Sequence, residues 1–97
     1  MKASSCLEPV RIAFCELFSL KLETSDVDRL LNEIPGFNYD SLRAYEFVSL
    51  LEEQFSIEVD LINDDLQYSL STLRRASELV WRHVQSGLVQ PVTPQNA

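Results

Sequence analysis

Glycine, cysteine and histidine are scarce in this chain, and long apolar runs are absent from it. The 97 residues include two glycines, two cysteines and one histidine. Small β-sheets need several turns rich in glycine and asparagine, so this scarcity argues against a sheet protein. No segment approaches the roughly 20 consecutive apolar residues that a membrane span needs. The sequence therefore predicts an all-α fold with no membrane span.

The two cysteines and the single histidine show no metal-binding pattern. Two thiols with His83 far along the chain are too few for a structural zinc site. The N-terminus lacks the charged, apolar and small-residue order of a secretory signal, which favours a cytoplasmic location without a disulfide framework. We expect no metal site, with Cys15 as a small core residue and Cys6 as an exposed thiol in an N-terminal tail.

The length of the chain limits what it can build. With 97 residues and 45% apolar content, it has room for one domain with a single modest core. Such a chain cannot wall a deep cleft between two lobes, so any chemistry lies on a shallow surface. This argues against a self-sufficient enzyme.

The net charge of −7 is concentrated in the middle of the chain. The segment from Glu23 to Asp65 holds twelve acidic residues and two basic ones. Such a field repels nucleic-acid phosphates and anionic lipids, and it steers basic protein surfaces toward the chain. The alternative is a merely well-solvated surface. In either case the charge argues against nucleic-acid binding.

Apolar residues recur at helical spacing in four segments. They predict helices over Pro9–Leu22, Ser41–Phe55, about Leu61–Leu66, and Leu73 to about Gln85. Asp40 is expected to cap the second helix and Asp60 the short third one, and either Ser71 or Thr72 caps the last. The predicted domain covers residues 9–86, with a long loop between the first two helices, a flexible tail at 1–8 and a disordered tail at 87–97.

Ser41 directly follows the expected cap residue Asp40 at the start of a helix. Unpaired backbone N–H groups and the helix dipole suit this position to a phosphate, by up to ~1 kcal/mol at an exposed site. Most Asp-Ser-Leu triplets are simply helix starts, so the surrounding residues decide the interpretation.

A longer pattern around Ser41 resembles the acyl carrier protein family. In that family the attachment serine lies in Asp-Ser-Leu, a glutamate follows five residues after the serine, and Leu-Glu-Glu-x-Phe closes the helix. This chain has, in the same order and spacing, Asp40-Ser41-Leu42, then Glu46, then Leu51-Glu52-Glu53-Gln54-Phe55. The segments Ile57-Glu58-Val59 and Ser71-Thr72-Leu73 also match, so the resemblance covers roughly residues 10–84.

The resemblance implies a monomeric four-helix bundle of the acyl-carrier type, with three long helices and one short one. A phosphopantetheinyl transferase, using coenzyme A and Mg²⁺, would join 4′-phosphopantetheine to Ser41, and Asp40 would support this modification. The thiol of the arm would hold an acyl intermediate as a thioester. Loading enzymes and downstream synthase or transferase enzymes would act on that intermediate, while the carrier itself catalyses nothing.

The resemblance also implies that partner enzymes read the exposed side of the second helix. The residues expected on this side are Leu42, Arg43, Glu46, Ser49, Glu52 and Glu53. Leu42 would supply an apolar contact beside Ser41, and the glutamates would face basic patches. For Glu52 and Glu53 a solvated helix surface is an equal alternative.

Some residues depart from the pattern of carriers of fatty-acid synthesis. Gly36-Phe37-Asn38-Tyr39 stands in place of Asp-Leu-Gly-x, Arg43 in place of an acid and Ser49 in place of a methionine. Asn38 tolerates the left-handed conformation, so the turn can survive. These departures favour a polyketide, specialised fatty-acyl or other secondary pathway.

Three alternatives remain open at this stage. An aminoacyl or peptidyl carrier, served by an adenylating enzyme, more often has Gly-Gly-His-Ser around the serine, which is absent here. A helical interaction subunit would have the same fold but would never be modified at Ser41. A hydrolase with Ser41 as nucleophile would need His83 as its base, although that residue is expected on the surface of the last helix.

Overall fold

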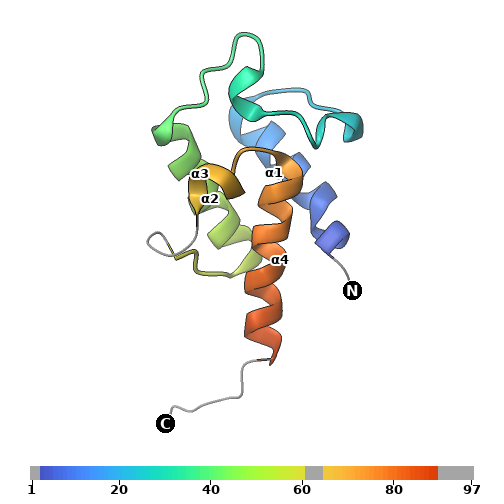
Figure 1. Ribbon diagram of the computed structural model, residues 1–97, viewed down its shortest axis with the longest axis vertical. Helices are drawn as coiled ribbons and strands as arrows, with labels where there is room; N and C mark the ends of the chain where they lie inside the picture. Colours follow the sequence, from blue (N-terminus) through green and yellow to red (C-terminus); the bar gives the residue numbers. More distant parts are fainter. Residues whose placement is uncertain (1–2, 61–64, 90–97) are drawn as a thin grey trace.

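The computed structural model describes residues 3–60 and 65–89, and the regular secondary structure of these residues is helical, with no strand among them (Figure 1). The α-helices are α1 (Leu7–Phe18), α2 (Ser41–Phe55), α3 (Leu66–Ser69) and α4 (Leu73–Val89). Short 3-10 helices are η1 (Ala3–Cys6), η2 (Thr24–Asp26) and η3 (Leu31–Glu33). Three long helices and one short helix therefore agree with the predicted all-α class. None of the helices in the described part of the chain is long and apolar enough to cross a membrane.

Helix α4 lies at the centre of the molecule. It contacts α1 and η1 on one side and α2 and α3 on the other (Figure 1). Its Leu73, Leu79 and Val80 are fully buried. This position explains the apolar periodicity of α4, since the helix has neighbours around much of its circumference.

Helix α1 starts and ends earlier than the sequence predicts. It begins at Leu7, with Pro9 in its first turn, and ends at Phe18, where Ser19 takes the left-handed conformation (φ 55°). The structure places residues 3–8 in helices rather than in a flexible tail. The prediction of an exposed Cys6 is wrong, because its side chain is only 7% exposed and belongs to the core beneath η1 and α4.

Helix α2 runs from Ser41 to Phe55, as predicted. The carboxylate of Asp40 accepts a hydrogen bond from the Arg43 N–H at 3.0 Å, which confirms Asp40 as the cap residue. The helix ends at Ser56, which has a positive φ of 54° and donates its N–H to the Glu52 carbonyl. Both ends of α2 are therefore determined by hydrogen bonds within the segment itself.

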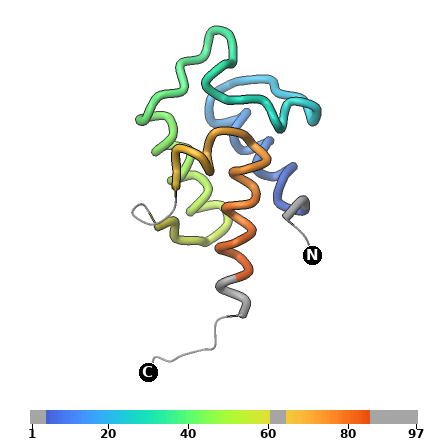
Figure 2. Tube along the Cα trace, in the orientation of Figure 1, coloured from blue at the N-terminus to red at the C-terminus, as the bar shows by residue number. Residues whose placement is uncertain are grey.

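The loop between α1 and α2 crosses one end of the helices (Figure 2). It is tied to the start of α4 by two backbone hydrogen bonds of 2.9 Å, from Leu31 N–H to the Ser71 carbonyl and from Arg74 N–H to the Val27 carbonyl. An ion pair of 2.7 Å between Arg74 and Asp28 lies beside them. The long loop thus has a defined course over the core, where Val27 and Leu31 are buried.

The short helix α3 begins at Leu66, the last residue of the predicted third helix. Its cap is Asp65, whose carboxylate accepts the Tyr68 N–H at 3.2 Å, and the helix spans Leu66–Ser69. The predicted helix near Leu61–Leu66 falls largely on residues 61–64, which lie outside the described residues, as does the tail from 90 to 97. Leu70, at the end of α3, is buried, so its apolar contacts stabilise this helix.

The hydroxyl of Thr72 caps α4, because it accepts the Arg75 N–H at 3.1 Å. Ser71 instead donates its hydroxyl to the Tyr68 carbonyl at 2.6 Å. The structure therefore decides between the two predicted caps in favour of Thr72. Helix α4 extends to Val89, a little beyond the predicted Gln85 and past the predicted domain limit at residue 86.

Aromatic rings form the centre of the core. The fully buried Phe14 lies with its ring centroid 4.9 Å from Phe18, 4.9 Å from Phe47 and 5.9 Å from Phe37, in edge-to-face or similar arrangements. Tyr39 lies at the margin of this group, with its centroid 6.0 Å from Phe14. Such contacts contribute about 0.5–1.5 kcal/mol per pair beyond their buried area.

Candidate functional site

Ser41 is the first residue of α2, and its side chain is exposed. The Asp40 carboxylate uses the Arg43 N–H, and the Asp40 carbonyl accepts the Ala44 N–H at 3.0 Å. The amides of the first helical residues have no acceptor within a helix and point out of its positive end. The Ser41 hydroxyl therefore lies at an exposed position where an attached anion is favoured.

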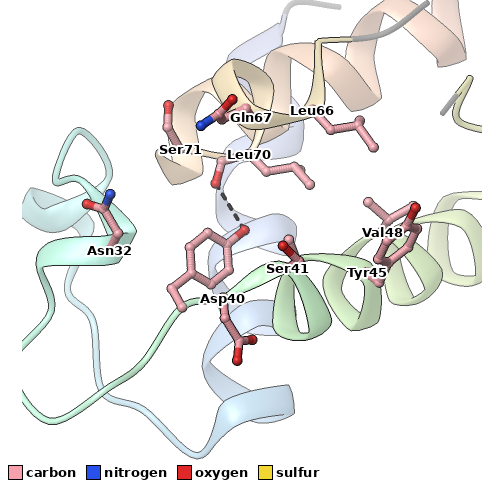
Figure 3. Close-up of a pocket in the computed structure, with 11 residues that line it drawn as sticks. Asn32, Asp40, Ser41, Tyr45, Val48, Leu66, Gln67, Leu70 and Ser71 are labelled. Carbon is pink, nitrogen blue, oxygen red and sulfur yellow. Dashed lines mark hydrogen bonds between the residues drawn. The ribbon is translucent and has the colours of Figure 1, made fainter. Parts of the chain in front are cut away.

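A cavity of about 600 Å³ opens beside Ser41. Figure 3 shows Ser41, Tyr45 and Val48 of α2 on one side of it and Leu66, Gln67 and Leu70 of α3 and its end on the other. Its remaining lining residues are Asn32, Tyr39, Asp40, Ala44 and Ser71. The lining combines apolar side chains between the helices with amide and hydroxyl groups.

Tyr39 connects the start of α2 with the end of α3. Its hydroxyl donates to the Leu70 carbonyl at 3.0 Å, the bond drawn as a dashed line in Figure 3. Burial without a nearby cation raises the pKa of the Tyr39 hydroxyl well above its usual range. The sequence around Tyr39 does not indicate this hydrogen bond, because the acceptor lies 31 residues away.

Five of the six residues predicted on the partner face are available on the surface of α2. Leu42 is 65% exposed, Glu46, Ser49 and Glu53 are exposed, and Arg43 is half-buried. The Arg43 guanidinium lies 3.8 Å from Asp40 and 5.8 Å from the centre of the Phe37 ring. Arg43 is therefore held beside the start of α2.

Glu52 has a structural contact that its sequence position did not reveal. Its carboxylate accepts a hydrogen bond from the Val59 N–H at 2.9 Å, and its side chain is half-buried. Val59 is buried in the core. Glu52 thereby joins the end of α2 to the segment that follows it, unlike its exposed neighbour Glu53.

Much of the acidity in the middle of the chain is engaged within the molecule. Among the described residues, six carboxylates there accept a helix-capping or backbone hydrogen bond or pair with an arginine; they are Glu23, Asp26, Asp28, Asp40, Glu52 and Asp65. The Arg74 guanidinium lowers the pKa of Asp28 through a side-chain hydrogen bond. Part of the acidity of this segment therefore also contributes to the fold.

The other chemically versatile residues lie away from Ser41. His83 is half-buried on α4 and is not among the residues that line the cavity. Burial raises the pKa of the Cys6 thiol, which favours its protonated form. Within the described ranges, no group of three or more His, Cys, Asp and Glu side chains could hold a metal ion. The candidate site is thus the Ser41 hydroxyl with the adjoining cavity.

Two further aromatic residues, Tyr68 and Trp81, have different positions. Trp81 is half-buried against the core, whereas Tyr68 is 56% exposed. The Arg75 guanidinium lies 4.2 Å from the centre of the Tyr68 ring and donates to the Ser71 hydroxyl at 2.8 Å. These contacts stabilise the joint between α3 and α4.

Comparison of the chain with protein-family models, with curated proteins and with solved structures finds no match.

Proposed function

We propose that this protein is an acyl carrier in which Ser41 bears a 4′-phosphopantetheine arm. The observation that carries the proposal is the exposed Ser41 hydroxyl at the start of α2, directly after its cap residue and at the mouth of a cavity. The order and spacing of Asp40-Ser41-Leu42, Glu46 and residues 51–55 support the same function.

The residues around Ser41 fit such a group. Its phosphodiester would lie at the positive end of α2, and Arg43 provides a cation in the same first turn. The amides of Asn32 and Gln67 and the Ser71 hydroxyl line the cavity and could bond the amides of an arm. The arm would supply a thiol that holds an acyl group as a reactive thioester.

The chain itself contributes the anchor and its surroundings. Modification would join the Ser41 Oγ to phosphorus, break the pyrophosphate link of coenzyme A, release adenosine 3′,5′-bisphosphate, and pass the hydroxyl proton to a base on the transferase. Asp40 holds the first turn of α2 and so presents Ser41 in one geometry. Partner enzymes would contact Leu42, Glu46 and Ser49 on the exposed side of α2.

An aminoacyl or peptidyl carrier would use the same anchor and differ in its cargo. Asp40 before the serine and the acidic middle of the chain favour the acyl form. A partner that docks through basic residues would find Glu46 and Glu53 exposed on α2. The pathways that fit best are polyketide, specialised fatty-acyl or other secondary ones, because Arg43 and Ser49 depart from carriers of fatty-acid synthesis.

Intact-mass measurement tests the proposal. The protein is incubated with coenzyme A, Mg²⁺ and a promiscuous phosphopantetheinyl transferase, and we expect a gain of one phosphopantetheine group. Ser41→Ala should abolish the gain, whereas Ser25→Ala, at an exposed serine in η2 outside the cavity lining and the partner face, should leave it intact. An unmodified wild-type chain would refute both carrier functions, and the interaction subunit would be the remaining alternative.

A further inference from the structure

Arg43 is the one basic residue of α2, and it lies two residues after Ser41. Its side chain is 40% exposed. The guanidinium lies 3.8 Å from the Asp40 carboxylate and 5.8 Å from the centre of the Phe37 ring. These contacts, one with the cap residue and one with the loop before it, hold the cation beside the first turn of α2. The positive charge next to Ser41 therefore has a defined position and is accessible from solvent.

The exposed carboxylates of α2 lie farther from the start of the helix. Glu46 and Glu53 are exposed, whereas the carboxylate of Glu52 accepts a backbone hydrogen bond. Because an α-helix rises 1.5 Å per residue, Glu46 lies about 4.5 Å and Glu53 about 15 Å beyond Arg43 along the helix axis. The exposed side of α2 therefore changes sign along its length, from a cation in the first turn to carboxylates in the later turns.

A guanidinium in this position favours an acidic group on a partner. It has five N–H donors, and its 3.8 Å separation from Asp40 is longer than a hydrogen bond, so donors remain for a second carboxylate. Arginine is more weakly hydrated than lysine and forms bidentate pairs with carboxylates, which suits it to an interface. A partner with a uniformly basic surface would instead place a like charge against Arg43, and this repulsion disfavours the complex.

We infer that Arg43 is a specificity-determining residue, and that the partner enzymes present an acidic residue to the first turn of α2 and basic residues to Glu46 and Glu53. Enzymes whose docking surface is basic throughout are disfavoured. This inference rests on the proposed function, because these enzymes act on the arm at Ser41. Arg43 contacts the docked enzyme and not the reacting atoms, so its effect belongs to binding.

A phosphopantetheinyl transferase with a basic carrier-binding surface is the probe. Its kcat and KM for the unmodified carrier are measured by intact mass for wild type, Arg43→Gln and Arg43→Glu. Glutamate is favourable at the third position of a helix, so Arg43→Glu should fold. We expect Arg43→Glu to raise kcat/KM by about fivefold, since an attractive contact with the strength of an exposed ion pair replaces a repulsive one. The gain should lie in KM, be smaller for Arg43→Gln, and shrink as salt is added.

Arg29→Glu is the matched control. Arg29 is exposed in the loop between α1 and α2, and its guanidinium also lies 3.8 Å from a carboxylate, that of Asp26. The substitution changes the net charge by the same amount as Arg43→Glu but lies outside α2. It should leave kcat/KM close to the wild-type value.

Substitutions in the transferase test the preference for an acidic residue. Each lysine and arginine of its carrier-binding surface is replaced singly by glutamate. At one of these positions the variant transferase should modify the wild-type carrier faster than Arg43→Glu, which reverses the preference of the original enzyme.

Either of two results would overturn the inference. If kcat/KM for Arg43→Glu does not exceed that for wild type, Arg43 does not repel a basic partner, and a lower kcat would assign Arg43 to the attached phosphate instead. If no transferase variant reverses the preference, Arg43 does not contact the docked enzyme. In both cases the mass gain at Ser41 still supports the carrier function, whereas absence of any gain in the wild-type protein refutes the carrier function and the inference together.

Discussion

At the scale of single residues, Tyr39 and Asp40 make different kinds of hydrogen bond at the start of α2. Asp40 acts locally, through the Arg43 N–H three residues ahead, and holds the first turn in place. Tyr39 acts at long range, through the Leu70 carbonyl. Together they fix Ser41 at the start of α2 beside the cavity, with its own side chain exposed.

Replacing Tyr39 by phenylalanine tests the long-range bond. At neutral pH we expect the free energy of unfolding to fall by about 1 kcal/mol, because the Leu70 carbonyl loses its donor. Burial raises the pKa of Tyr39 in the folded state above its ordinary value of 10.0, so the unfolded chain releases this proton first. The wild-type stability contributed by Tyr39 should therefore be constant below pH 10 and decline above it.

Denaturant titrations of wild type and Tyr39→Phe between pH 7 and pH 11 measure this effect. The difference between the two proteins should shrink above pH 10, since the variant has no hydroxyl to titrate at this position. A difference that stays constant to pH 11 would contradict a Tyr39 pKa raised by burial.

At the scale of elements, the N-terminal segment is part of the domain. Helix η1 packs against α4, and Cys6 lies among the buried core residues. The first turn of α1 therefore follows directly after η1, and Cys6 gives η1 an apolar contact of its own. The segment therefore stabilises the side of α4 that faces away from the candidate site.

Substituting each cysteine by serine tests the burial of η1. Cys6→Ser should lower the free energy of unfolding by about 1 kcal/mol or more, because a hydroxyl is placed in an apolar site. Cys15→Ser should cost less, since Cys15 is half-buried and its thiol already donates toward the Leu22 carbonyl at 3.9 Å. Equal and negligible costs, measured by urea unfolding, would show that the η1 segment does not pack in solution as it does in the structure.

At the scale of the whole molecule, several of the acidic side chains behind the net charge of −7 also stabilise the fold. The ion pair between Asp28 and Arg74 joins the long loop to α4 across 46 residues of sequence. Capping carboxylates at Asp40 and Asp65 stabilise the two helices that border the cavity. Part of the acidity thus supports the fold and part, at Glu46 and Glu53, remains exposed on α2.

The pairing of Asp28 predicts a loss of stability in acid. Arg74 lowers the pKa of Asp28 in the folded state below its ordinary value of 3.8, so this contribution is complete above pH 3.8 and is lost as pH falls through the lowered value. Arg74→Met should reduce the acid dependence of the thermal midpoint between pH 5 and pH 2. Lys21→Met, at an exposed lysine in the loop after α1, is the control. An unchanged acid dependence in Arg74→Met would exclude this pair as its source.

The sequence predicted the boundaries of some helices better than those of others. The bounds of α2 follow from Asp40 and from apolar spacing within the segment, and both are visible in the sequence. The start of α1 depends on burial of Cys6 against α4, which no local pattern records. For α3 the cap is Asp65, and the contacts of Leu66 and the burial of Leu70 against the core stabilise the helix.

The sequence by itself determined the helical class, the cap at Asp40 and the place of Ser41 at a helix start. These features depend on hydrogen bonds and apolar spacing within a few residues, so they can be predicted from the local sequence. The tertiary structure alone decided the cavity beside Ser41, the bond from Tyr39 to Leu70, the role of Glu52 and the burial of Cys6. Each of these depends on which surfaces meet when the chain folds, because distant segments must first be packed together before such contacts can form.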